Sequence, residues 1–205
     1  LVFIQVAFLV KIDVGDNFTA AIIHSHAAPY TSNLAFMFIP VLLLVNIARE
    51  FDYAVVQRSL VSGISRRGYF MGKLLQLGLF SVFAFVLAII FSLLASAIYR
   101  TPVVWDFEKP AMFFIVAFCL GSFSLMLAFI LKKRFYALAV FMGYALLENT
   151  LTAIMAGKTI LLPFQTCIRL LRQGIYEWPE FIMAGTYTII FLPMALQIFR
   201  RSDLR

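Results

Sequence analysis

Residues 74–99 read LLQLGLFSVFAFVLAIIFSLLASAIY, a run without a charged side chain that ends at Arg100. About 20 apolar residues carry a helix across the ~30 Å hydrocarbon core of a bilayer. This run is therefore long enough to cross a membrane with some tilt. It predicts a membrane-spanning helix.

The composition of the whole chain also favours a lipid environment. Of the 205 residues, 63% are hydrophobic and 13% are charged, whereas a soluble domain of this size carries about 25% charged residues. The mean hydropathy is +0.95. A water-soluble surface cannot be assembled from such a chain. We therefore expect an all-α integral membrane protein in which residues 1–205 form a single transmembrane domain.

Further apolar segments extend this prediction to six helices. Full spans are expected at 28–48, 74–99, 111–131, 135–156 and 181–199, and a partial one at 1–12. The segment at 1–12 supplies about half of the length needed to cross. It is either a truncated first helix of a longer native chain or a signal-like segment without its basic start.

Lysine and arginine are concentrated on one side of these spans. That side holds Arg49, Arg58, Arg66, Arg67, Lys73, Lys132, Lys133, Arg134, Arg200, Arg201 and Arg205. The opposite side holds fewer cations and most of the acids. By the positive-inside rule the basic side is cytoplasmic, which places the C-terminus inside. The net charge of +7 is thus explained by topology, and no nucleic-acid partner is expected.

Cysteine and histidine give no metal site in this sequence. Cys119 and Cys167 are too few for a disulfide framework and wrongly spaced for zinc, so we expect both to be packing residues. His24 and His26 suggest either metal or haem ligands or a polar spot on an outer loop or helix end. No further ligands at matching depth are apparent, which favours the polar spot. We expect this chain to bind no cofactor.

The most polar stretch connects the second and third spans, residues 49–73. As a helix it places apolar residues on one face by steps of three and four. These residues are Tyr53, Val56, Leu60 and Ile64. Gly63 is a plausible bend. Two interpretations fit: a basic helix that lies on the membrane surface, and an element that docks against a partner.

Residues 46–75, NIAREFDYAVVQRSLVSGISRRGYFMGKLL, resemble the loop between the second and third helices of type-2 ATP-binding-cassette (ABC) export permeases. That pattern has a Glu before a Gly-Thr turn, then a Leu, a Ser-Arg pair and a Gly-Lys that opens the third helix. The matching positions are Glu50, Leu60, Ser65, Arg66, Gly72 and Lys73. Ala54 and Val55 stand where the family has Gly-Thr. The helix spacing also fits, so the resemblance covers nearly the whole chain.

The resemblance implies a permease subunit of an ATP-driven exporter in the cell membrane, the inner membrane in a bacterium. Its partners would be a second permease copy or a paralogue, membrane lipid, and a separate ATPase subunit that binds ATP and Mg. This chain has no phosphate-binding loop or other catalytic motif, so we expect no enzyme activity of its own.

In the family, the loop contains a coupling helix that docks into a groove of the ATPase. The residues that would couple here are Glu50, Phe51, Asp52, Tyr53, Val56, Gln57, Arg58, Leu60, Ser65, Arg66, Arg67 and Lys73.

Residues 157–180 form the second informative segment, on the outer side. An interfacial amphipathic helix anchored by Tyr176 and Trp178 fits its mixture of apolar and basic residues. The resemblance implies short re-entrant helices that cap the exit path. Candidate gate or substrate residues are Glu148, Asn149, Pro163, Phe164 and Arg169.

Glu148 is expected near membrane depth, where an ionisable group is costly and suggests function. It contacts the substrate or gate, or it is solvated at the helix end, or it is hydrogen-bonded between subunits. The 23 phenylalanines are expected to pack against lipid and core, in preference to forming a substrate box.

Two other functions remain open from the sequence. One is a structural anchor subunit of a larger membrane complex, for example a respiratory one, with no transport of its own. The other is a self-contained secondary transporter, which would normally show more buried ionisable groups and two matching halves with broken helices. The sequence shows neither further buried ionisable groups nor two matching halves with broken helices.

Overall fold

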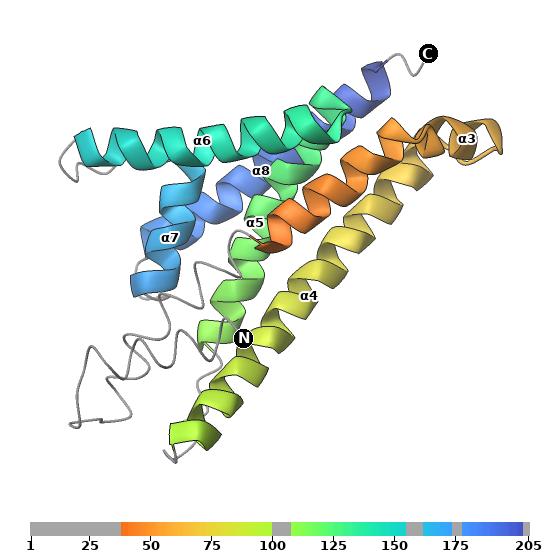
Figure 1. The fold of residues 1–205 in the computed structure, drawn as a ribbon. Helices are drawn as coiled ribbons and strands as arrows, with labels where there is room; N and C mark the ends of the chain where they lie inside the picture. The colour runs from red at the N-terminus through yellow and green to blue at the C-terminus, as the bar shows by residue number, and fades with distance from the viewer. Residues whose placement is uncertain (1–37, 100–107, 155–161, 174–177, 203–205) are drawn as a thin grey trace.

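The described part of the chain is entirely helical. The computed structural model describes residues 38–99, 108–154, 162–173 and 178–202 (Figure 1). A helix over residues 38–52 precedes α3 (Val55–Val61), α4 (Arg66–Tyr99), α5 (Glu108–Leu131), α6 (Arg134–Ile154), α7 (Pro163–Gln173) and α8 (Trp178–Arg201). The all-α prediction is confirmed within these ranges. The predicted partial span at 1–12 and the His24 and His26 pair lie outside them.

Three of the described helices are long and apolar enough to cross a bilayer. They are the segments Arg66–Ile90 of α4, Pro110–Leu131 of α5 and Pro179–Arg201 of α8. In the most apolar window of each, 72% of the α5 residues are buried, against 22% in α4 and 11% in α8. A helix that is apolar on all sides belongs at the centre of a bundle. The three helices indicate a multi-pass membrane protein.

α5 lies between the other two long helices. It packs extensively against both α4 and α8, which hardly touch each other (Figure 1). Gly121 in α5 makes the approach of α4 close, because a Cβ at this position would lie 2.3 Å from Leu77 Cδ1 and 3.3 Å from Leu43 Cδ2. The outward faces of α4 and α8 keep large apolar side chains exposed, as lipid-facing helices do.

α7 and α3 lie toward opposite ends of the molecule (Figure 1). α7 packs against α5, α6 and α8. α3 stands where the helix over 38–52 turns back into α4, beside the C-terminal end of α8. α6 leaves the bundle at a steep angle and exposes many apolar side chains, including Phe135, Leu146 and Ile154.

Two helix boundaries differ most from the sequence expectation. The predicted span 74–99 is the C-terminal part of α4, which begins at Arg66 because the Ser65 side chain caps it: the Gly68 N–H donates to Ser65 Oγ at 3.0 Å. The span predicted at 28–48 continues to residue 52. Charged residues marked the predicted limits, but backbone hydrogen bonding continues through them.

Candidate functional site

α3 is a short helix between two positions with positive φ. Ala54, at φ 54°, separates it from the helix over 38–52, and Gly63, at φ 98°, follows the Ser62 that ends it. Glycine adopts this region freely, whereas an L-residue such as alanine does so at a cost of roughly 1 kcal/mol. The chain therefore turns back within residues 53–65 and leaves α3 at the tip.

One side of α3 is anchored and the other is exposed. Val56 is fully buried in the main core, and Leu60 packs partly against it. Val61 is 89% exposed, and Val55 and Arg58 are also exposed. Among the described residues, the core uses Val56, and the Val55–Arg58–Val61 side packs against none of it.

The single stripe predicted for Tyr53, Val56, Leu60 and Ile64 is divided in the structure. Tyr53 and Ile64 are exposed, whereas Val56 is buried. The helical repeat applies only within 55–61, because Tyr53 precedes the turn at Ala54 and Ile64 follows the one at Gly63. Tyr53 instead lies under a cation, with Arg49 Cζ 5.3 Å from its ring centroid.

Glu50 ties the helix over 38–52 to α4. Its two carboxylate oxygens accept hydrogen bonds from the Tyr69 hydroxyl and the Lys73 ammonium. The Lys73 and Glu50 side chains are 11% and 23% exposed. Lys73 also donates to Gln76 Oε1 at 3.2 Å. Loss of one partner from such a pair leaves a poorly solvated charge uncompensated, so the pair is a structural brace below α3.

Two further contacts brace the same end. Asp52 Oδ2 accepts a hydrogen bond from the Arg134 backbone N–H at 3.4 Å and lies 3.6 Å from Arg134 Nε. Phe51 packs edge-on against Phe129 of α5 at 5.8 Å between centroids. The ion pair is largely solvated and contributes under about 1 kcal/mol. Together they connect the α3 end to the α5–α6 turn.

Arg66 joins the first turn of α4 to the last turn of α8. Its guanidinium donates to the backbone carbonyls of Phe199 (3.4 Å), Arg200 (2.5 Å) and Ser202 (3.2 Å). Carbonyls in the last turn of a helix lack backbone partners within the helix, and a cation also complements the negative end of the helix dipole. Arg66 therefore connects α4 to the C-terminal end of α8 within this chain.

Three other predicted coupling residues have side chains that no described contact engages. Arg58 and Arg67 are exposed and Gln57 is half-buried. Within the described ranges, their side chains make no hydrogen bond or ion pair. Tyr69, which the sequence did not single out, belongs to the brace: its ring stacks on Phe199 at 5.4 Å. Tyr69 lies one helical turn before Lys73, and this spacing could have predicted that the two side chains lie on the same face of the helix.

Glu148 holds the start of α7. It is 0% exposed, and its Oε2 accepts hydrogen bonds from the backbone N–H groups of Phe164 (3.0 Å) and Gln165 (3.1 Å). These belong to the first turn of α7, where N–H groups lack partners within the helix. Pro163 at the first position needs none. Solvation at the helix end is thus excluded for Glu148, and these bonds lie within one chain.

The other predicted gate residues differ in their burial. Asn149 is exposed and Arg169 is half-buried. Phe164 is buried in an aromatic cluster, 5.1 Å from Phe141 and 5.9 Å from Phe123 between centroids. The cluster, with the fully buried Phe129 and Phe199 elsewhere, agrees with the prediction that phenylalanines pack the core.

Cys119 and Cys167 meet between α5 and α7. Both are buried and free, and the two thiols are neighbours. The prediction that they are packing residues agrees with this burial. No group of three or more His, Cys, Asp or Glu side chains that could hold a metal occurs in the described ranges.

Comparison with known proteins identifies no family for this chain. No protein-family model matches the chain, and no curated protein matches it. The resemblance of residues 46–75 to ABC export permeases therefore stays a prediction.

Proposed function

We propose that this chain is the membrane-spanning permease subunit of an ABC-type exporter and that α3 couples it to a separate ATPase subunit. The observation that carries the proposal is the form of α3: a short helix at the tip of the bundle, anchored by Val56, with the exposed side of Val55, Arg58 and Val61 turned outward. Exposed apolar residues next to a cation suit a protein groove.

The brace beneath α3 supports a mechanical role. Glu50 binds Tyr69 and Lys73 of α4, and Arg66 of α4 binds the end of α8. A displacement of α3 would move α4 and α8 together, because packed helices move as a rigid body when the contacts between them are kept. Glu50, Tyr69, Lys73 and Arg66 would then transmit motion without touching the ATPase.

The conformation of Ala54 also supports the resemblance. The family pattern has glycine at this turn, and Ala54 adopts the left-handed conformation that glycine adopts most readily. The backbone requirement is thus present even though the residue differs.

The opposite end suits a gate. α7 is a separate short helix that Glu148 ties to α6 by two hydrogen bonds to its first turn. In the proposed exporter α7 closes the outer end of a path between two permease copies, and the exposed apolar residues of α6 offer surface to the second copy. The protein would reside in the cell membrane with α3 and the C-terminus in the cytoplasm.

The variant Val61→Glu tests the coupling surface. Val61 makes no contribution to the core, so we expect unchanged expression and stability, but at least tenfold weaker association with the ATPase subunit, since a carboxylate would be desolvated in an apolar groove. Co-purification with a candidate ATPase subunit that carries a phosphate-binding loop, and ATP hydrolysis by the complex, measure this.

Lys133→Gln is the matched control. It changes the net charge by the same amount at the same end of the bundle, on an exposed residue of the α5–α6 turn. Normal association and hydrolysis are expected. Equal behaviour of Val61→Glu and wild type would remove α3 as the docking element.

A further inference from the structure

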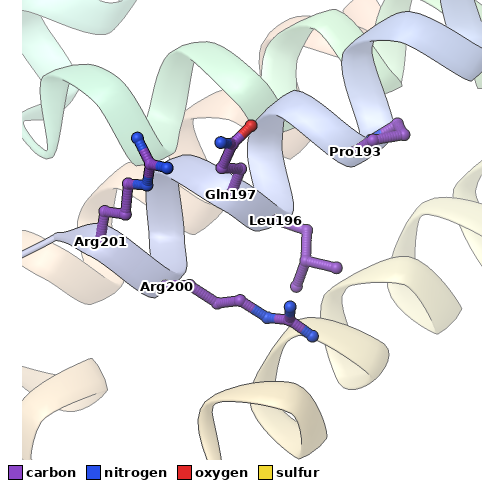
Figure 2. Close-up of a pocket in the computed structure, with 5 residues that line it drawn as sticks. All are labelled: Pro193, Leu196, Gln197, Arg200 and Arg201. Carbon is purple, nitrogen blue, oxygen red and sulfur yellow. The ribbon is translucent and has the colours of Figure 1, made fainter.

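A groove runs along the outward side of the C-terminal half of α8. Its volume is about 460 Å³, and it is open to the outside. It is lined by Pro193, Leu196, Gln197, Arg200 and Arg201, whose spacing places them on one side of a helix. Figure 2 shows Leu196 and Arg200 extending to one side of α8, and Gln197 and Arg201 to the other. One guanidinium thus stands on each flank.

Both guanidiniums lack a counter-charge in the described ranges. Arg200 and Arg201 are exposed, and neither side chain makes an ion pair or hydrogen bond there. The acids described at this end are engaged elsewhere, Glu50 with Lys73 and Asp52 with Arg134. The α8 carbonyls are also already bound, by Arg66. Within the part of the chain that the structure describes, the groove therefore presents positive charge that no acidic side chain balances.

The groove continues into an apolar surface toward the middle of α8. Ile189, four residues before Pro193 on the same side, is 72% exposed, and Ile190 and Met194 are also exposed. From Arg200 back to Ile189 the helix rises about 16 Å at 1.5 Å per residue. This is close to one leaflet of a hydrocarbon core of ~30 Å. The length and polarity match a single lipid with its head group at the arginines.

We propose that this groove is a binding site for one anionic phospholipid, with its phosphate between Arg200 and Arg201 and an acyl chain along Leu196, Pro193 and Ile189. The site needs only that α8 crosses the membrane, so it is independent of the proposed transport function. Basic pockets at the ends of membrane helices bind anionic head groups by charge-assisted hydrogen bonds, and arginine does so bidentately.

Native mass spectrometry of the purified full chain tests the site. The protein is equilibrated with equal amounts of phosphatidylglycerol and phosphatidylcholine that have identical acyl chains. We expect wild type to retain phosphatidylglycerol about tenfold in preference. The double variant Arg200→Gln/Arg201→Gln should lose this preference. The control Arg67→Gln/Lys133→Gln removes the same charge at the same end and should keep it.

A measurement on wild type avoids dependence on the folding of the variant. A photoactivatable phosphatidylglycerol should label residues 189–201, and excess soluble glycerol phosphate should not displace it. The proposal is overturned by labelling elsewhere in the chain, by displacement with glycerol phosphate, which would indicate a site for a soluble anion, or by equal loss of preference in both double variants, which would indicate net charge alone.

Discussion

Glu148→Ala is expected to release α7 from the bundle. The substitution removes the carboxylate that accepts hydrogen bonds from the buried N–H groups of Phe164 and Gln165, and the loss of a buried hydrogen-bond partner costs about 1–3 kcal/mol. A loss of about 3 kcal/mol is a large part of the stability of a small domain. Glu148→Gln keeps one acceptor oxygen and should show a smaller loss.

The native Cys167 reports the position of α7 directly. It is buried in the wild type, so maleimide should react slowly with it in a Cys119→Ser background. We expect Glu148→Ala to raise the rate at least tenfold, with Glu148→Gln in between. Asn149→Ala, an exposed neighbour on α6, is the control and should react like wild type. Unchanged protection of Cys167 in Glu148→Ala would show that Glu148 does not hold α7.

If the chain is the proposed permease subunit, Glu50→Lys is expected to uncouple ATP hydrolysis from transport while the chain still inserts in the membrane. The new ammonium would face Lys73 at a site where both side chains are mostly buried. Breaking such a pair and replacing it with repulsion costs about 3 kcal/mol. The brace would open and α3 would lose its fixed position. ATPase stimulation by substrate, with transport in vesicles, measures the coupling.

The charge-swapped variant Glu50→Lys/Lys73→Glu separates the brace from surface charge. If the pair acts by holding the two helices together, the swap should restore much of the coupling, and the two substitutions should be strongly non-additive. Arg58→Glu is the complementary variant, since Arg58 is exposed and outside the brace. It should weaken ATPase association without a loss of stability. Normal coupling in Glu50→Lys would contradict the brace.

The sequence predicts the positions of the long helices well because lipid imposes a simple rule on them, although among the described residues only three of the five predicted full spans are long and apolar enough to cross. Residues 74–99 and 111–131 carry long runs without charge, and a helix is the way to satisfy every backbone group in hydrocarbon. The limits of the helices were less predictable. α4 begins at Arg66 because the Ser65 side chain caps it. The spans were predicted from runs without charged residues, and such runs do not indicate where a helix cap lies among polar residues.

The candidate site was predictable as a segment but not as a set of contacts. Glu50 and Lys73 were both identified in residues 46–75, yet their pairing depends on how the helix over 38–52 lies on α4. Arg66 was predicted to be a coupling residue from its place in this segment, and its hydrogen bonds to carbonyls at the C-terminal end of α8, 133–136 residues away in the chain, had no local signal. Contacts of such separation follow from tertiary packing, which no local pattern encodes.

Glu148 shows the same limit at the other end. Its sequence position near the end of an apolar run correctly marked it as unusual. Its actual partners, two backbone N–H groups of α7, lie beyond residues 155–161 and carry no side-chain signature. A buried carboxylate that caps another helix can be recognised only once both helices are placed.

Site-specific crosslinking from α3 to the ATPase subunit tests the central claim most directly. Val61→Cys is placed in a Cys119→Ser/Cys167→Ser background, with Ile154→Cys as the control because Ile154 is 73% exposed and lies at the far end of α6. A candidate ATPase subunit, one that carries a phosphate-binding loop, is engineered with cysteines in the groove where α3 is proposed to dock. Coupling through α3 predicts a crosslink from position 61 that responds to ATP, and none from position 154. A crosslink from position 154 alone, or purification of the chain in a complex without an ATPase, would contradict the permease assignment.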